Sequence, residues 1–256
     1  HDAVDDEHRR VDDPQRRGET AIYIDPAMSE RIAAARHGPY MVEPDTVAWR
    51  RESLLRQIGY GIVNRRLQRL ARQGDPPFRD AGLGTGDTFR EGRTTNLIVD
   101  TVDGKWQRGL ISATVEYRRA LRYGFTAGEV TEQLANIRTA LENDAASAAT
   151  RSHGALVNSV FGLLRNDLVP APPEAALARF REFAPSITAK SVLAALKKEA
   201  VPLTDPLLRL QGRREPEGGA AALRAAWNEA LRRPLVRERD GENASFAYTS
   251  FGPPGK

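Results

Sequence analysis

The longest regular pattern of apolar and polar positions runs from Asp45 to Gly74. Its apolar residues recur three and four positions apart, which places them on one face of a helix. They are Leu54, Leu55, Ile58, Ile62, Leu67 and Leu70. The side chain of Asp45 can cap the free N–H groups at the start, and Gly74, followed by two prolines, is expected to end the helix. The pattern predicts one long amphipathic helix that turns its apolar face toward a core.

A second amphipathic pattern follows and leads into a helix junction. Its inward positions are Trp106, Leu110, Ala113, Tyr117 and Leu121. Gly124 can end this helix, and Thr126 with Glu129 then has the spacing of a capping box. Phe125 and Val130 have the spacing of a hydrophobic staple. The junction predicts a tight hairpin of two helices, and capping explains Glu129 better than a role as a catalytic acid or base.

The rest of the chain alternates short strands with helices. Strands are predicted at Glu19–Ile24, Leu97–Val99 and Leu207–Leu210, with a weaker candidate at Arg31–His37. Further helices are predicted at Val130–Leu141 with an extension to Thr150, at Leu156–Leu164, at Glu174–Phe183, from a Thr188 cap to Leu196, and at Ala220–Leu231. Few strands precede the long helical stretch, which favours an α+β fold with a mainly antiparallel sheet and helices packed on one face.

The composition is that of a soluble globular protein. Hydrophobic residues make up 40% and charged residues 28% of the 256 positions. No apolar run reaches the roughly 18–20 residues of a membrane span, so we expect no membrane partner. The chain has no cysteine, which excludes disulfides and thiolate metal sites. Residues 1–18 are charged and polar, lack the pattern of a signal peptide, and predict a flexible lead.

Arginine dominates the basic residues without giving the chain a strong net charge. Lysine and arginine number 38 against 34 acidic residues, a net charge of +4, and only five of the 38 are lysines. The best candidate for a nucleic-acid surface is the run Arg65–Arg72. Leu67 and Leu70 within it must face inward, and no aromatic platform or known motif accompanies it. We therefore expect no nucleic-acid partner.

A glycine-rich run, Gly82-Leu-Gly84-Thr-Gly86, has a superficial likeness to a phosphate-binding loop. Such a loop needs a Lys-Ser/Thr pair directly after its last glycine. The residue that follows is Asp87, whose charge would repel phosphate. The run is better explained as a flexible strand edge or a β-bulge.

The residues that could bind a catalytic metal do not form a recognisable motif. The four histidines are His1, His8, His37 and His153. A catalytic zinc needs three protein ligands, and neither H-x-x-E-H nor H-E-x-x-H occurs in the sequence. His153 has the surroundings of a helix cap or a surface residue, and the acidic run Asp2–Glu7 those of a solvated tail. We predict no catalytic, cofactor-binding or metal-binding residue in this chain.

Several of these features, taken in order, resemble one lobe of a known enzyme family. They are Arg65-Arg66-Leu67-x-x-Leu70, Pro76-Pro77-Phe78, Trp106, Glu116-x-Arg118-Arg119-Ala120, Gly124-Phe125-Thr126 with Glu129-Val130, Ile187-Thr188 with Val192, and the closing run from Phe246 to Gly255. Their order and spacing over residues 19–255 resemble the second, non-catalytic domain of a long bacterial member of the pitrilysin/insulinase family of zinc metallopeptidases.

The resemblance implies a role inside a larger peptidase. In this family two halves of similar fold enclose a chamber, and zinc is bound in the first domain by H-x-x-E-H and a distant glutamate. The chain would then be a non-catalytic segment, inactive alone and without a cofactor. Its partners would be the catalytic half of a zinc metalloendopeptidase and that enzyme's peptide substrates. The alternatives are an inactive partner subunit and a stand-alone arginine-rich module that binds protein or nucleic acid.

The resemblance also divides the chain. Residues 19–212 correspond to the non-catalytic domain, incomplete at its N-terminus, and residues 213–256 to a linker with one helix toward a missing next domain. The first strand and helix of such a domain have no counterpart before Glu19. One edge of the sheet is therefore expected to be exposed or to pair with another chain.

Overall fold

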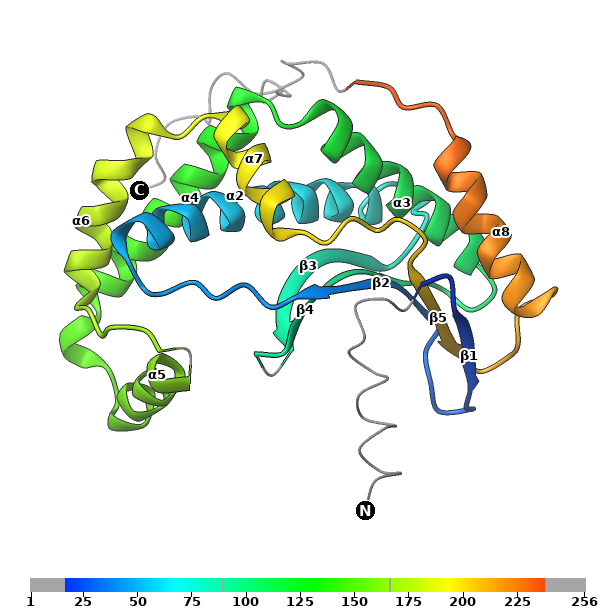
Figure 1. Ribbon diagram of the computed structural model, residues 1–256, viewed down its shortest axis with the longest axis horizontal. Helices are drawn as coiled ribbons and strands as arrows, with labels where there is room; N and C mark the ends of the chain where they lie inside the picture. The colour runs from blue at the N-terminus through cyan, green and yellow to red at the C-terminus, as the bar shows by residue number, and fades with distance from the viewer. Residues whose placement is uncertain (1–16, 89, 166, 238–256) are drawn as a thin grey trace, which may run out of the picture.

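The computed structural model describes residues 17–237 except positions 89 and 166, and Figure 1 shows the arrangement of its elements. In chain order they are β1 (Thr20–Ile24), β2 (Arg31–Pro39), α2 (Val47–Ala71), β3 (Asp80–Thr88), β4 (Gly92–Asp100), α3 (Trp106–Tyr123), α4 (Ala127–Ala146), η1 (Ala148–Thr150), α5 (His153–Arg165), α6 (Pro173–Phe183), η2 (Ala184–Ser186), α7 (Ala189–Glu199), β5 (Leu207–Gly212) and α8 (Gly219–Arg232). Each helix predicted from the sequence is present, with its ends shifted by a few residues.

The strands form one five-stranded sheet in the order β1-β5-β2-β4-β3. β1 pairs with β5 in parallel, and the other neighbouring pairs are antiparallel. This confirms the predicted α+β class with a mainly antiparallel sheet. The three predicted strands are present, although Leu97–Val99 is only the middle of the nine-residue β4. The weaker candidate Arg31–His37 forms β2, which lies at the centre of the sheet.

Helices α2, α3 and α8 pack on one face of the sheet, as predicted, and α4 and α7 pack against α2 (Figure 1). Alternate strand residues point toward these helices because successive side chains of a strand face opposite sides. The apolar ones that are at most 1% exposed are Ile32, Ala34, Leu97, Val99, Leu208 and Leu210. Leu223 and Trp227 of α8 belong to the same core. The helix expected within the 213–256 segment therefore packs directly on the domain.

The ends of α2 differ from the prediction. Thr46, not Asp45, is the N-cap residue, and its hydroxyl accepts a hydrogen bond from the Trp49 N–H at 3.1 Å. The Asp45 carboxylate instead binds Arg50 and the N–H of Val169 at 2.7 Å. At the other end, α2 ends at Ala71 with Arg72 as its C-cap, before the predicted stop at Gly74. Both predicted ends of α2 are only slightly displaced, because several polar residues near each end of the helix could cap it.

The predicted junction between α3 and α4 is confirmed in detail. Gly124 follows α3 with φ of 74°, a left-handed value that favours glycine. The Thr126 hydroxyl accepts from the Glu129 N–H at 3.2 Å, and the Glu129 carboxylate accepts from the Thr126 N–H at 2.9 Å. Phe125 and Val130 are buried, at 8% and 4% exposure. Local sequence signals therefore place this helix boundary correctly.

Parts of the prediction fall on residues that the structure does not describe. Of the predicted lead at 1–18, only the last two residues are described. The closing run from Phe246 to Gly255 lies entirely outside the described residues. The proposed domain boundaries thus remain predictions. Among the helices of residues 17–237, none combines the length and the apolar character that crossing a membrane requires.

Candidate functional site

The face of the sheet opposite the helices carries small side chains along β3 and in the middle of β2. Ala33 and Ala35 of β2 point to this side, since their neighbours Ile32 and Ala34 are buried under the helices. The register places Gly82 opposite Ile98 and Gly84 opposite Asn96, so the glycines of β3 share this side. Tyr23 of β1 lies at the other end and is 50% exposed. We call this surface the open face.

A shallow groove of about 480 Å³ crosses the open face along β3 and β4. It is lined by Gly82, Gly84, Gly86, Asn96 and Ile98, with Arg31, Asp80 and Asp100 at one end. A side-chain carbon added at Gly84 or Gly86 would meet no atom of the described residues within 4 Å, so these residues leave the space beside the glycines empty. Arg31 binds Asp100 through two hydrogen bonds of 2.6 and 2.9 Å. The groove thus combines a small, nearly flat floor with one charged end.

The glycine-rich run forms the edge strand β3, as the sequence predicted, but it contains no bulge. Each residue from Asp80 to Thr88 pairs in unbroken register with one from Gly92 to Asp100. The strand then leads into β4 and not into a helix, which excludes the geometry of a phosphate loop. Regular pairing replaces the expected bulge because the three glycines adopt extended backbone angles.

One residue of α2 covers part of the outer edge of β3. The Asn64 amide oxygen accepts from the Leu83 N–H at 2.7 Å, and the Asn64 amide nitrogen donates to the Leu83 carbonyl at 3.1 Å. In an antiparallel pair, alternate residues turn both backbone groups away from the partner strand. Ala81, Thr85 and Asp87 therefore also present their N–H and C=O groups to the outer edge. Sequence reasoning missed Asn64, because a lone polar residue on a helix gives no local signal of such a contact.

A second contact from α2 fixes the same strand. The Tyr60 hydroxyl lies 2.5 Å from the Thr85 hydroxyl, which in turn lies 2.6 Å from the hydroxyl of Thr95 on β4. Burial raises the pKa of Tyr60 well above its ordinary range, so the phenol remains a hydrogen-bond donor. Tyr60 and Asn64 are four residues apart and thus lie on the same side of α2. Together they hold the edge strand against the helix.

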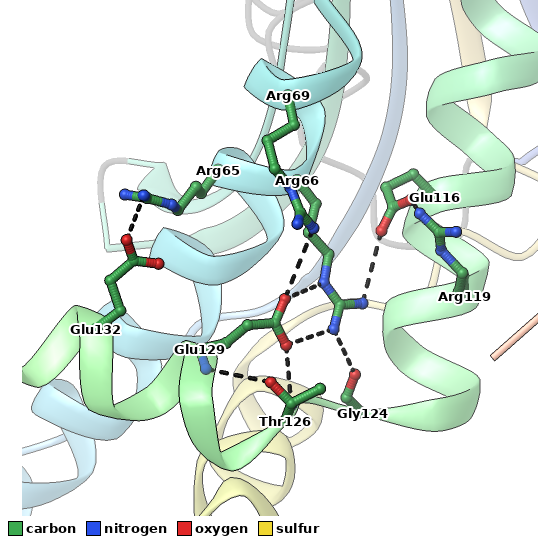
Figure 2. A network of polar contacts seen from close by, with 9 residues as sticks. All are labelled: Arg65, Arg66, Arg69, Glu116, Arg119, Gly124, Thr126, Glu129 and Glu132. Atoms are coloured by element: carbon green, nitrogen blue, oxygen red, sulfur yellow. Dashed lines mark hydrogen bonds and ion pairs between the residues drawn. The ribbon is translucent and has the colours of Figure 1, made fainter. Parts of the chain in front are cut away.

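The position of α2 is itself fixed by a buried arginine (Figure 2). Arg66 is 3% exposed and binds Glu129 of α4 through two hydrogen bonds of 2.6 and 2.7 Å. It also donates to the Gly124 carbonyl at 3.1 Å and lies 3.6 Å from a Glu116 oxygen on α3. Its guanidinium group stands 5.6 Å from the centre of the Phe125 ring. One side chain thus joins α2 to both helices of the hairpin.

This network gives Glu129 a structural role. Burial alone would raise the pKa of Glu129, but hydrogen bonds from Arg66 and from the Thr126 N–H outweigh it and hold the pKa below its ordinary value. A carboxylate that stays ionised and is bound on both oxygens is poorly suited to donate or accept a catalytic proton. The structural role predicted for Glu129 agrees with this geometry. The sequence did not indicate that the same carboxylate also binds Arg66.

The basic run Arg65–Arg72 is largely neutralised by acidic residues of the chain itself (Figure 2). Arg65 forms an ion pair with Glu132, and Arg69 lies 4.0 Å from a Glu129 oxygen. With Arg66 buried in the network, three of the four arginines in the run contact a carboxylate. The run therefore needs no nucleic acid to balance its charge.

The two histidines among the described residues lie on different elements. His37 is on the open face of β2, with its Nδ1 atom 2.7 Å from the Thr94 hydroxyl. His153 is the first residue of α5 and is exposed. His1, His8 and the acidic start fall outside the described residues. Within residues 17–237, no group of three histidine, aspartate or glutamate side chains could hold a metal ion. The described residues therefore do not fit a catalytic zinc.

Comparison with known proteins gives partial sequence matches and several similar folds. No model of a known protein family matches the chain. The chain is 32% identical to the chloroplastic stromal processing peptidase of Pisum sativum over 82 residues, which cover 32% of this chain and 6% of that protein. Such a short match identifies a related segment and does not describe the whole of either protein.

The solved structures cover most of the chain. The first half of the periplasmic protease PqqL from Escherichia coli superposes with a TM-score of 0.74 at 18% identity, covering 86% of this chain and 48% of that one. A predicted insulinase family protease from Yersinia pestis gives 0.62 at 17% identity, covering 84% and 46%. A peptidase M16 inactive domain from Pseudomonas fluorescens gives 0.55 at 15% identity, covering 78% and 45%.

These structures confirm the fold that the resemblance implied. The chain has the fold of a peptidase domain found in insulinase-type proteins, including one described as inactive. It spans about half of each of these three chains.

Proposed function

We propose that this chain is a non-catalytic lobe of a zinc-dependent metallopeptidase and forms part of the wall of its peptide-binding chamber. The observation that carries the proposal is the difference between the two faces of the sheet. Helices α2, α3 and α8 cover one face, while the other presents a groove of about 480 Å³ with small side chains. Likeness to halves of proteases, one of them an inactive domain, supports this role.

The open face suits an extended peptide. Peptides commonly bind such surfaces by adding a strand to a sheet edge, where the backbone gives affinity and alternate side chains enter neighbouring pockets. The outer edge of β3 offers backbone N–H and C=O groups, and the empty space beside Gly84 and Gly86 can receive a side chain. The Arg31–Asp100 pair gives the Asp80 end of the groove a polar rim. The lobe would thus bind and orient substrate without reacting with it.

Hydrolysis is assigned to the other half of the enzyme. A zinc-bound water, with a glutamate as general base, supplies that chemistry in metallopeptidases of this type. This chain has no H-x-x-E-H motif, and the ligands of such a zinc would come from the catalytic half. Alone, the chain should neither bind stoichiometric zinc nor cleave peptides.

Reconstitution tests the proposal. The chain is produced alone and together with a chain from the same genome that carries H-x-x-E-H, and cleavage of a quenched fluorescent peptide is measured. We expect no cleavage by the chain alone and at least about tenfold faster cleavage by the pair than by the motif-carrying chain alone. Replacing the motif glutamate with glutamine in the pair should abolish cleavage. Equal rates with and without this chain would contradict the proposal.

The coding region upstream of His1 distinguishes two forms of the same lobe. An H-x-x-E-H motif encoded there in the same reading frame would make this chain a segment of one long peptidase. A motif on a separate gene whose product copurifies with this chain would make it an inactive partner subunit.

The binding-module alternative has its own test. Binding of DNA or RNA with a steep dependence on salt would favour it. We expect no such binding, because carboxylates of the chain contact most arginines of the Arg65–Arg72 run.

A further inference from the structure

We propose that Asn64 is a specificity-determining residue, whose amide caps the β3 edge at Leu83 and confines an added peptide strand to the Gly84–Thr88 segment. The inference rests on the proposed function, because it describes how a peptide would bind the β3 edge. It concerns a residue of the helix layer that reaches the edge strand and not a residue of the groove itself.

The Asn64 amide makes the two hydrogen bonds that a residue of an added strand would make. Its oxygen accepts from the Leu83 N–H at 2.7 Å, and its nitrogen donates to the Leu83 carbonyl at 3.1 Å. Both outward backbone groups of Leu83 are therefore already bonded within the chain. A peptide could bind there only by displacing the amide and leaving its own donor and acceptor to be satisfied elsewhere.

Asn64 is held where it can act as a cap. It is half-buried on α2, four residues after Tyr60, whose hydroxyl binds Thr85 of the same strand. Two residues further on, buried Arg66 fixes α2 to the α3–α4 hairpin. The helix backbone therefore cannot shift away from β3 without breaking these contacts. The cap is consequently part of the folded domain and does not depend on a flexible loop.

The cap divides the edge into unequal parts. Outward backbone groups occur at every second residue, which places them at Ala81, Leu83, Thr85 and Asp87. With Leu83 capped, Thr85 and Asp87 form one continuous stretch, and Ala81 remains isolated beyond the cap. An added strand pairs with that stretch and must end or turn away opposite Leu83. The edge thus favours peptides that end or bend opposite Leu83, and it disfavours a long straight strand that continues past Leu83.

The cap can be tested first without any peptide. Hydrogen exchange of individual backbone amides is measured by NMR on the full chain. In Asn64→Ala the Leu83 amide should exchange at least about fivefold faster, since its acceptor is gone. In Asn64→Asp the oxygen acceptor remains, so protection of Leu83 should be retained. Gln68→Ala, at an exposed position of the same helix, is the matched control and should change nothing at Leu83. An unchanged Leu83 rate in Asn64→Ala would overturn the cap.

The confinement is tested with a defined probe, an acetylated and amidated (Thr-Val)₄ peptide. In the parent protein it should slow the exchange of the Thr85 and Asp87 amides and leave Ala81 unaffected. In Asn64→Ala protection should extend to Leu83, and the Kd should fall about tenfold, the effect of the two further hydrogen bonds that Leu83 can then make. The same peptide N-methylated at every residue lacks all backbone donors and should not bind.

The outcomes separate the two proposals. Protection across Ala81, Leu83 and Thr85 in the parent would overturn the confinement and leave the peptide-binding role intact. Failure of the probe to bind either form would overturn the confinement and remove the β3 edge from the peptide site. The reconstituted cleavage assay would then decide independently whether the lobe still serves as a chamber wall.

Discussion

The two faces of the sheet are built from the same five strands and differ in almost every physical respect. On the helix side, alternate residues such as Ile32, Leu97 and Leu208 are fully enclosed. On the open side the corresponding positions carry Ala33, Ile98 and glycines, and an added methyl group at Gly84 would meet no atom of the described residues within 4 Å. Under the proposed function, stability and peptide binding depend on alternate positions of one sheet. A substitution should affect one or the other according to the direction in which its side chain points.

The largest expected difference concerns two arginines that each bind a carboxylate through two hydrogen bonds. Arg66 lies buried on the helix side, and Arg31 is exposed on the open face. Arg66→Ala should lower the free energy of unfolding by about 3–5 kcal/mol, because it removes the guanidinium group that binds both oxygens of the largely buried Glu129 carboxylate. Arg31→Ala should cost only about 0–1 kcal/mol. Urea unfolding followed by circular dichroism measures both free energies. Equal losses of stability in the two variants would contradict the predicted difference between the two faces.

The Arg66 effect should also depend on pH in a defined direction. Because the folded-state pKa of Glu129 is lowered, its contribution to stability is present above the unfolded-state pKa of about 4.3 and is lost as pH falls through the folded value. The difference in the free energy of unfolding between Arg66→Ala and the parent should therefore become smaller as the pH falls below about 4. A gap that stays constant from neutral pH to pH 3 would show that Arg66 acts through packing alone.

Next in size is a pair of aromatic substitutions. Phe125→Ala should cost about 2–4 kcal/mol, because the ring is 8% exposed and its removal leaves a cavity. Tyr23→Ala on the open face should cost about 1 kcal/mol or less, since that ring is 50% exposed. Thermal and urea unfolding of both variants provide the measurement. A Tyr23 variant as unstable as the Phe125 variant would mean that the open face also carries core packing.

One chemical change, glycine to alanine, tests the two sides directly. At Gly109 of α3 the new carbon would lie 2.4 Å from Thr101 Cγ2, so Gly109→Ala should destabilise by about 1–3 kcal/mol. At Gly84 the space is empty, so Gly84→Ala should leave stability unchanged or raise it by up to about 1 kcal/mol. Unfolding midpoints in urea measure both. Destabilisation at Gly84 would indicate that the groove is filled.

The smallest expected effect concerns the N-terminal cap of α4 on the helix side. Thr126→Ala should cost about 1 kcal/mol through the lost cap of α4. Thr139→Ala is the control, because Thr139 lies exposed in the middle of the same helix and its hydroxyl only bonds back to the Ala135 carbonyl. It should change stability by less than about 0.5 kcal/mol. If the melting curves of Thr126→Ala and the parent coincide, the cap contributes nothing.

Features encoded by neighbouring residues could be predicted from the sequence. The capping box at Thr126, the Thr188 cap of α7 and the amphipathic helices depend on spacing within one or two turns, and the structure confirms them. The start of α2 was displaced by one residue, because Asp45 and Thr46 are both good caps. The Asp45 carboxylate is occupied by Arg50 and by the Val169 N–H, and local pattern gives no sign of the contact with Val169. That contact joins segments more than a hundred residues apart.

The features that define the candidate site were the ones least visible in the sequence. β3 contains three glycines, which have low strand propensity, and it is regular because β4 pairs with it and α2 holds it. Neither Asn64 nor Arg66 could be assigned a partner from local pattern, since their contacts lie 19 and 63 residues away. Long-range hydrogen bonds, not periodicity, shape the edge of the sheet.

The Glu129 carboxylate has a consequence for how the domain opens. One of its oxygens accepts both the Thr126 N–H, which begins α4, and the guanidinium group of Arg66 on α2. The first turn of α4 therefore cannot fray as an isolated helix end would, since loosening it also breaks the attachment to α2. Local and global opening are joined at this residue, and the α3–α4 hairpin and α2 should behave as one cooperative unit. The lobe would then reach its partner as a preassembled body that needs no ordering when it docks.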